Sequence, residues 1–579
     1  MAQENVSGQD TTTNRRRYLK AIGVGGLVSL AGCIGDDDDG GNGNGNGNGN
    51  GNGNGNGNGN GNGNGNGGAD IQQGGHLRVT GIAPPATLSP YEGNSQGDFI
   101  FFEMMYDRLT SYNRDLELET ELATEWEPND EGSEWTFTLR EDATFATIDQ
   151  QVLAEDVEAS VGLMQEEERA PGASADLYGA TSVEVEDDSR FTISLSDPDP
   201  RYPNRLAETG SWFNIAPKNV IEDRWDEITS TDFGSGPFTL TNFEQDDIYE
   251  FEGSDDWFET DENGNTYPYV DRVTVQNIPD QVAQTDALTG ERQDTLQVLQ
   301  PQQRTRVDRS DVTQPESFRS PALLSMVLNT TVETENGDQP FADNRVRQAM
   351  KHALDREEIS AATDGTMVPG NHSGVAPVHP NVADFDPGLE FGTTAQPDEA
   401  RALLEEAGYD DGLTLPKPIY EREFQARRET AVLLFQEQMA EVGIEFDIQL
   451  VTPDTWLSEY WNQDGVWYAS GFAARIEETT VQQLAMQCDG RWNSGRWCNE
   501  DYQAAYDTFS TTTDQETYVE NFKEAQRVAH LNNAWIVFGY LKQFGASNNY
   551  VNNHNPGPAL NKDFNFDTWL SSDAPEGPD

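Results

Sequence analysis

Lysine is nearly absent from this chain of 579 residues, which contains only seven. Lysine and arginine together number 36 against 102 aspartate and glutamate residues, which gives a formal net charge of −66. In dilute buffer this charge destabilises a compact state, whereas in molar salt the Debye length falls to ~3 Å and screens the repulsion. Binding to nucleic acid is disfavoured, because the chain as a whole repels phosphate. The composition therefore predicts a protein that folds in concentrated salt.

Cysteine and histidine are also scarce, with three and six residues. The histidines show no close metal-ligand spacing, and the body of the chain lacks the motifs G-x-S-x-G, H-E-x-x-H and a phosphate-binding glycine loop. We therefore expect no enzyme, no metal site and no cofactor. The contents of 35 % hydrophobic and 10 % aromatic residues favour a folded core over the alternative of an acidic disordered protein.

The N-terminal segment combines a basic region with a short apolar run. Arg15-Arg16-Arg17 is followed by Tyr18-Leu19-Lys20, which is similar to a twin-arginine export signal. The apolar run Ala21–Ala31 is much shorter than the ~20 residues that span a bilayer. The run ends in Leu30-Ala31-Gly32-Cys33, which resembles a lipobox. Residues 1–33 therefore predict a signal peptide, with Cys33 lipidated and the protein anchored at the extracytoplasmic face of the cell membrane.

Residues 34–74 follow as a predicted disordered tether. The part from Gly40 to Gly68 is an almost pure alternation of glycine and asparagine, with no side chain that could bury apolar surface. A flexible chain of this length has a reach of roughly 35 Å. An asparagine-rich aggregation segment is the alternative interpretation, which the glycines disfavour.

Cys488 and Cys498 are the two cysteines that remain. An even pair in an oxidising compartment predicts a disulfide. Closing so short a loop stabilises the fold by about 2–3 kcal/mol in the chain-entropy model. Two free buried thiols are the alternative.

The body alternates strand and helix patterns. Period-two hydrophobicity predicts strands at 76–80, 135–139 and 273–278, a hairpin at 183–195, and a strand with Ile444, Phe446, Ile448 and Leu450 on one face. Helical spacing predicts helices at 99–109, 154–164, 281–288, 431–442 and 518–530, the last followed by a strand at 535–540. The fold class is therefore α/β, with more than one core.

Several segments, in order, resemble the family 5 extracytoplasmic solute-binding proteins of ABC importers, the peptide-binding type. The most specific is Pro340-Phe341-Ala342-Asp343-Asn344-Arg345-Val346-Arg347-Gln348-Ala349-Met350, continuing to Ala353-Leu354-Asp355-Arg356. Others are Trp135-Thr136-Phe137-Thr138-Leu139-Arg140, Leu153-Ala154-Glu155-Asp156-Val157 and Gly234-Ser235-Gly236-Pro237-Phe238. The acid excess, scarce lysine and export signal together resemble a haloarchaeal lipoprotein form of that family.

This resemblance implies a two-lobed, periplasmic-binding-protein-like clamp of the large type, with mixed sheets and an extra α/β domain. Lobe one would comprise 75–107, 201–278 and 546–573, the extra domain 108–200, and lobe two 279–545. Ligand would lie in the cleft between the lobes.

The resemblance also points to candidate ligand-binding residues. Peptide binders of the family carry an aspartate in a G-W-x-x-D segment, whereas this chain has Gly471-Phe472-Ala473-Ala474-Arg475. Arg475 would repel a peptide ammonium and bind a carboxylate or phosphate; pairing with Glu477 or Glu478 is the alternative. Phe472, Trp492 and Trp497 are candidates for aromatic contacts, with a core role for the tryptophans as the alternative, and Tyr91 and Glu92 would line the cleft from lobe one.

The predicted function is that of a lipid-anchored binding protein, not an enzyme, that delivers a peptide-like solute to ABC permease and ATPase subunits; this solute would be anionic if Arg475 faces the cleft. We expect a monomer. A sensory receptor that signals to a membrane transducer is the alternative function, and the substrate stays open among peptide, sugar, opine-like compound and metal chelate.

Overall fold

The computed structural model describes residues 71–577, apart from 82, 94–95, 114, 167–168, 171–178, 208–212, 386–390, 424–425, 473–474, 476 and 555–565. The predicted signal peptide, Cys33 and almost all of the tether lie outside the described residues. No helix in the described part is long and apolar enough to cross a membrane.

A mixed sheet of eleven strands runs through the described part of the body. Its order is β10 (Phe238–Glu244), β11 (Ile248–Gly253), β12 (Arg272–Gln276), β1 (His76–Thr80), β13 (Thr295–Leu296), β21 (Trp535–Asn548), β14 (Thr313–Val327), β20 (Tyr468–Phe472), β17 (Ile419–Arg422) and β19 (Ile448–Val451), with β15 (Met367–Val368) also on β21. Strand β1 is parallel to β12 and β13, and β17 is parallel to β20 and β19. The mixed α/β fold class is therefore confirmed.

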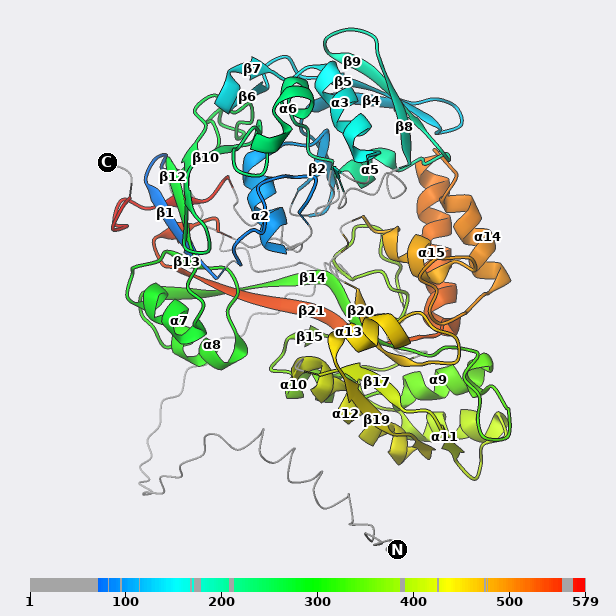
Figure 1. Ribbon diagram of the computed structural model, residues 1–579. Coiled ribbons are helices and arrows are strands. Elements are labelled where there is room, and N and C mark those ends of the chain that lie inside the picture. Colours follow the sequence, from blue (N-terminus) through cyan, green and yellow to red (C-terminus); the bar gives the residue numbers. More distant parts are fainter. Residues whose placement is uncertain are drawn as a thin grey trace, which may run out of the picture. The chain divides into compact units, whose positions relative to one another are not determined.

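Two long antiparallel strands, β14 and β21, join the two halves of this sheet (Figure 1). At one end β21 pairs with β13, and at the other end β14 pairs with β20. Helices α7 (Gln281–Thr289) and α8 (Pro301–Asp308) lie beside the first end, where a small core forms from Leu288, Leu296, Leu299, Val307, Phe544 and Ala546. The segment 279–312, which is predicted to belong to lobe two, thus hydrogen-bonds through β13 to β1, a strand predicted for lobe one.

The N-terminal part of the body builds a second sheet beside the first. Its order is β4 (Ala123–Pro128), β5 (Glu134–Leu139), β9 (Arg190–Leu195) and β8 (Ala180–Val185). Around it lie α2 (Gln96–Met105), α3 (Ala154–Met164), α5 (Tyr202–Leu206), α6 (Lys218–Asp223) and the short pairs β2 (Thr110–Tyr112)–β3 (Leu118–Thr120) and β6 (Thr144–Phe145)–β7 (Gln150–Gln151). Helix α3 begins where the Asp156 carboxylate accepts the backbone N–H of Leu153 at 2.8 Å, as expected for an acidic residue in a first turn.

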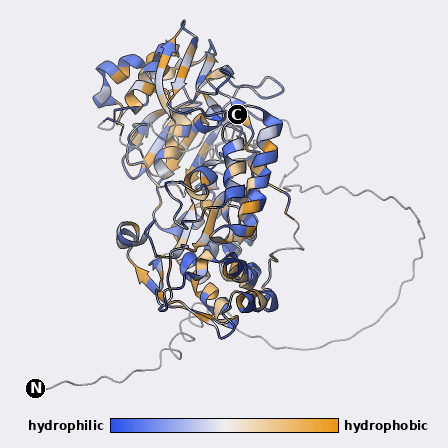
Figure 2. Ribbon diagram, turned by 90° about the vertical axis from the view of Figure 1, so that its right-hand side faces the viewer, coloured by the Kyte–Doolittle hydropathy of each residue, from blue (hydrophilic) through white to orange (hydrophobic). Residues whose placement is uncertain are grey.

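The C-terminal part surrounds β20, β17 and β19 with helices. These are α9 (Asn344–Ala353), α10 (Arg356–Ala362), α11 (Pro397–Glu406), α12 (Ala426–Glu441), α13 (Pro453–Thr455), α14 (Glu500–Phe509) and α15 (Gln515–Asn532). The side chains of Asp343, Asp355, Asn499 and Asp514 accept backbone N–H groups at the starts of α9, α10, α14 and α15. Helices carry hydrophilic and hydrophobic residues on different sides (Figure 2), which is how they cover a buried sheet.

Most of the predicted elements are present, but two differ. Helix α2 ends at Met105 rather than Leu109. The carbonyl oxygen of Met105 instead accepts the N–H of Gly236 at 2.9 Å, and a Cβ on Gly234 would lie 1.7 Å from that oxygen. The close approach explains both the early end of the helix and the glycines of the Gly-Ser-Gly-Pro segment.

The strand predicted over 444–450 is divided in two. β18 (Ile444–Glu445) pairs with β16 (Leu413–Thr414), while β19 pairs with β17 at the edge of the large sheet. The carbonyl of Phe446 accepts from the Gln436 amide at 2.6 Å, so the chain leaves one partner strand before it reaches the next. Leu450 is consequently 48 % exposed, and the prediction of one apolar face was wrong.

Candidate functional site

The carboxyl ends of two parallel strands, β17 and β20, meet at one edge of the large sheet. Tyr420 of β17 lies opposite Tyr468 of β20, so Arg422 and Phe472 end their strands on the same side. Helix α12 begins four residues after Arg422. Carboxyl ends of parallel strands beside a helix N-terminus are a common place for ligands in α/β proteins, and the predicted segment 471–475 follows β20 directly.

Three arginines are concentrated at this edge. Arg428 pairs with the buried Glu421 at 3.0 Å and donates to the carbonyl of Ala469 at 2.8 Å. The guanidinium of Arg422 lies over the Trp456 ring at 4.2 Å, and no ion pair among the described residues joins Arg422 or Arg427 to a carboxylate. Burial, followed by the charge of Arg428, lowers the pKa of both arginines, that of Arg422 to about 10. Glu421, Glu423 and Glu429 balance the formal charge of this segment, but the guanidinium groups of Arg422 and Arg427 are suited to hold an anionic group.

Arg475 is half-buried in the segment that follows β20. The adjacent positions 473, 474 and 476 lie outside the described residues. The two carboxylates considered as its alternative partners, Glu477 and Glu478, both bind Arg201 instead, at 3.0 and 3.6 Å. These acids are thus already paired with another cation.

Two of the predicted aromatic residues lie together. The ring of Phe472 is 6.0 Å from that of Trp492 and 5.2 Å from that of Trp535, and Trp492 is 6.0 Å from Trp461. Phe472 and Trp492 are both only partly buried, so they present ring surface near the end of β20.

A disulfide joins Cys488 to Cys498 and closes the loop that carries Trp492. The side chain of Asn493 ties this loop together from within, since its amide donates to the carbonyls of Cys488 at 3.2 Å and Trp497 at 2.7 Å. The loop therefore holds Trp492 in a fixed position next to Phe472.

The other predicted ligand contacts lie elsewhere. Tyr91 is 0 % exposed, and its hydroxyl donates to the carbonyl of Asn214 at 2.9 Å, which makes it a core residue in this structure. Trp497 is 5 % exposed and packs edge-on against Tyr502 at 5.1 Å, also within a core. Glu92 is partly exposed, and burial raises the pKa of its carboxyl. The burial of Tyr91 and Trp497 leaves them outside the proposed site.

A second cluster of charge lies around Arg201, just before α5. Besides its two ion pairs, the Arg201 guanidinium covers the Tyr518 ring at 4.4 Å. Glu478 also accepts from the hydroxyl of Tyr518 at 2.7 Å and from the amide of Asn381 at 2.7 Å. Glu477 and Glu478 are 0 % and 3 % exposed, so this network ties the start of α5 to three separate segments of the C-terminal part, at Asn381, Glu477–Glu478 and Tyr518.

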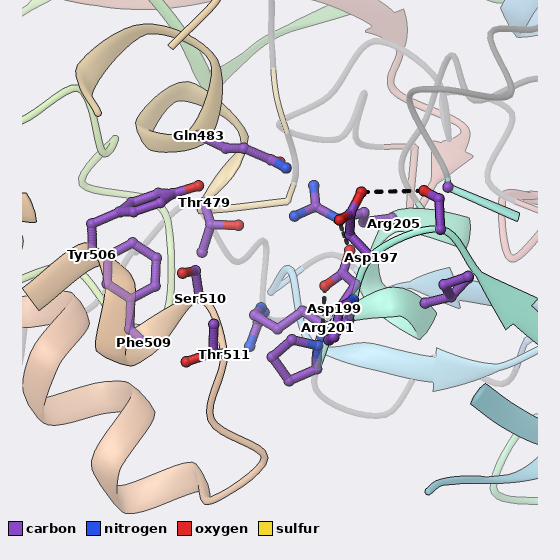
Figure 3. A pocket seen from close by; sticks show the side chains of 15 residues that line it. Asp197, Asp199, Arg201, Arg205, Thr479, Gln483, Tyr506, Phe509, Ser510 and Thr511 are labelled. Atoms are coloured by element: carbon purple, nitrogen blue, oxygen red, sulfur yellow. Dashed lines mark hydrogen bonds and ion pairs between the residues drawn. The ribbon is translucent and has the colours of Figure 1, made fainter. Parts of the chain in front are cut away.

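Two cavities adjoin Arg201. One has a volume of about 220 Å³ (Figure 3). It lies between Asp199, Arg201 and the α5 residue Arg205 on one side and Thr479 and Tyr506 on the other. The other, of about 270 Å³, is lined by Arg201, Asn204 and Glu478 among others. None of the six predicted ligand residues lines either cavity.

Sequence reasoning missed Arg201, Arg422, Arg427 and Arg428. Three arginines within seven residues are unusual in a chain so poor in basic residues, and this spacing was a usable signal for the arginine cluster. Arg201 gave no such signal, because its partners are almost 300 positions away along the chain.

Comparisons with known proteins agree with this architecture. Residues 117–487 match the family model described as "Bacterial extracellular solute-binding proteins, family 5 Middle". The glutathione-binding protein GsiB of Salmonella typhi is 22 % identical over 471 residues, covering 78 % of this chain and 86 % of GsiB. The oligopeptide-binding protein AppA of Bacillus subtilis is 24 % identical over 404 residues, covering 66 % of this chain and 70 % of AppA. The structure of HbpA2 from Haemophilus parasuis superposes with a TM-score of 0.73 at 20 % identity, over 86 % of this chain and all of HbpA2.

Proposed function

The chain belongs to family 5 of the bacterial extracellular solute-binding proteins, and we propose that it is the substrate-binding component of an ABC importer. It would capture a peptide-like solute outside the cell and deliver it to permease and ATPase subunits. Relatives named as glutathione- and oligopeptide-binding proteins, and a similar structure titled as an ABC transporter-associated protein in complex with a peptide, support this substrate class.

The bound solute presents an anionic group to the edge formed by β17 and β20. The observation that carries this proposal is the cluster of Arg422, Arg427 and Arg428 at the end of the strands that lead to Arg475. A carboxylate held by guanidinium groups forms parallel charge-assisted hydrogen bonds, which an ammonium group cannot form there. The rings of Phe472 and Trp492 would cover the apolar part of the ligand.

The test is a thermal-shift series in molar KCl on the full chain carrying Cys33→Ser, so that the result does not depend on a lipid. The ligands are free tripeptides, N-acetylated tripeptides, glutathione, small dicarboxylates and neutral oligosaccharides. A ligand that binds only the folded state stabilises it by about 2.7 kcal/mol at a hundredfold excess over Kd.

We expect carboxylate-bearing ligands to raise the midpoint, N-acetylated peptides included, and Arg475→Ala to remove the response. Arg401→Ala is the matched control, because Arg401 is exposed, forms its ion pair with the exposed Asp398 and otherwise donates to the carbonyl of Glu441. Peptides that stabilise the parent and Arg475→Ala equally, and that need a free amine, would contradict the proposed role of Arg475. No response to any of the ligands would contradict the proposed substrate class.

The location of the protein is also part of the proposal. Twin-arginine export, lipidation of Cys33 and a flexible tether over 34–74 would hold a monomeric body near its permease at the outer face of the membrane. The proposed division into lobe one, the extra domain and lobe two has the bounds given above, with the lobe-two segment 279–312 paired to lobe one through β13 and β1. Mass spectrometry of the N-terminal peptide tests the lipid directly: we expect a lipid-modified Cys33, and an unmodified Cys33 in the membrane fraction would refute the anchor.

A further inference from the structure

Three basic side chains meet on one face of the two long strands that join the halves of the sheet. Arg319 of β14 lies directly opposite Lys542 of β21, so the two side chains leave the same face. Phe544 is two positions after Lys542 and shares that face. The guanidinium of Arg304, from α8, covers the Phe544 ring at 4.0 Å, and the ammonium of Lys542 lies 5.3 Å from the same ring.

No ion pair among the described residues joins Arg304, Arg319 or Lys542 to a carboxylate. Helix α8 does have acidic neighbours, since Arg306, two residues from Arg304, pairs with Asp286 of α7. The one side-chain hydrogen bond of Arg304 goes to a backbone carbonyl, that of Asp364, at 3.1 Å. In a chain with 102 acidic residues, these three cations therefore lie together without an ion-paired carboxylate among the described residues.

This arrangement is unfavourable as it stands. Like charges directly opposite each other on a strand pair are destabilising. Burial, followed by the charges of Arg304 and Arg319, lowers the pKa of Lys542. Arg319 is exposed and Lys542 and Arg304 are half-buried, so solvent and small ions can reach all three.

We propose that Arg304, Arg319 and Lys542 form a binding site for a phosphate group. Two guanidinium groups and an ammonium offer several donors from three directions, which suits the tetrahedral oxygens of a phosphate better than a single carboxylate. The net negative charge of the protein does not prevent this in molar salt, because the long-range repulsion is screened over ~3 Å and short hydrogen bonds remain.

The site lies where the two parts of the sheet are joined (Figure 1). Arg304 comes from α8 beside β13, Arg319 and Lys542 come from the connecting strands, and Asp364 belongs to the turn after α10 of lobe two. A phosphate bound here braces these segments against one another. It is separate from the edge at β17 and β20, and its chemistry is that of either a free phosphate or a phospholipid headgroup.

The test uses the full chain carrying Cys33→Ser, in molar KCl, with inorganic phosphate as the first ligand. We expect phosphate to raise the thermal midpoint of the parent, and the double variant Arg319→Gln/Lys542→Gln to weaken phosphate binding by at least about tenfold, equivalent to about 1.4 kcal/mol. Arg306→Gln is the matched control on the same helix and keeps the full response. Arg319→Lys, which keeps the charge, retains most of it.

A second arm measures sedimentation with vesicles of dioleoylphosphatidylglycerol or of dioleoylphosphatidylcholine. Binding to the anionic vesicles that is lost in the double variant assigns the site to a lipid headgroup, whereas a response to inorganic phosphate alone assigns it to a soluble phosphate. A midpoint that phosphate raises equally in the parent and the double variant reflects general salt stabilisation and overturns the proposal. The absence of any response in both arms overturns it as well.

Discussion

Replacing Arg201 by methionine should destabilise the protein far more than replacing an exposed arginine. The guanidinium of Arg201 neutralises Glu477 and Glu478, whose side chains are 0 % and 3 % exposed. Removing one partner of a buried ion pair leaves an uncompensated charge, which costs about 3–5 kcal/mol. Methionine keeps most of the apolar volume, so the loss measures the charge rather than a cavity.

The stability difference between the parent and Arg201→Met should change with pH in a definite direction. Burial raises the pKa of Glu477, but the charges of Arg201 and Arg205 and the hydrogen bond from Thr479 together outweigh this effect. The pKa of Glu477 therefore lies below its usual value. In the parent, Glu477 therefore contributes stability above the unfolded pKa of about 4.3, and this stability is lost as pH falls. In Arg201→Met the raising effect of burial prevails, so the variant gains stability relative to the parent as pH falls.

The assay is urea unfolding in molar KCl at pH 7 and pH 5, followed by circular dichroism. Arg190→Gln is the control, because Arg190 makes two ion pairs, to Glu127 and Glu186, at 39 % exposure and exposed pairs contribute about 0–1 kcal/mol. Equal losses in both variants, or an Arg201→Met loss that grows as pH falls, would refute the reasoning about the buried network.

Three further predictions concern the rest of the body. Burial, with the charges of Lys351 and Arg356, lowers the pKa of His530 to about 3, so the free energy of unfolding falls as pH drops below 6.5, by about 2 kcal/mol at pH 5. His530→Asn should reduce this dependence of the unfolding free energy on pH. An unchanged pH dependence in unfolding measurements would contradict the prediction. Replacing Cys488 and Cys498 by serine should lower the free energy of unfolding by about 2–3 kcal/mol, and a reducing agent should affect the parent alone. Gly234→Ala should destabilise the protein by ~3 kcal/mol or more, because the new Cβ would overlap the Met105 carbonyl at the end of α2. Gly162→Ala in α3, where a Cβ meets nothing within 4 Å, should stabilise by about 0.5–1 kcal/mol. Similar unfolding midpoints for the two variants would refute the steric argument.

Local patterns were reliable where one segment settles its own structure. The helix at Ala154–Met164 was predicted to the residue, because its acidic first turn and apolar spacing are both local. The end of α2 was not predicted correctly, because the carbonyl of Met105 accepts a hydrogen bond from the N–H of Gly236, 131 positions further along the chain. The strand over 444–450 was likewise divided by partner strands that no local pattern identifies.

The predictions of candidate site residues show the same contrast between local pattern and tertiary packing. Phe472 and Trp492 were identified from segments that resemble the family, and the structure brings their rings together. Tyr91 came from the same kind of resemblance, yet its hydroxyl is bound inside the core. Position along the chain indicates which segment approaches a cleft, whereas the direction of a side chain depends on the neighbours that surround it.

The sequence by itself determined the family, the α/β class, the cysteine pair and the extreme charge, because each of these depends only on the identity and spacing of residues along the chain. Only the tertiary structure decided which charges meet. It pairs Glu477 and Glu478 with Arg201, brings Arg428 against the Ala469 carbonyl of β20, and places Arg319 opposite Lys542. Neither of these last two cations is ion-paired among the described residues. Electrostatic energy depends on distance through space and on burial, and neither quantity can be read from the order of residues along a chain.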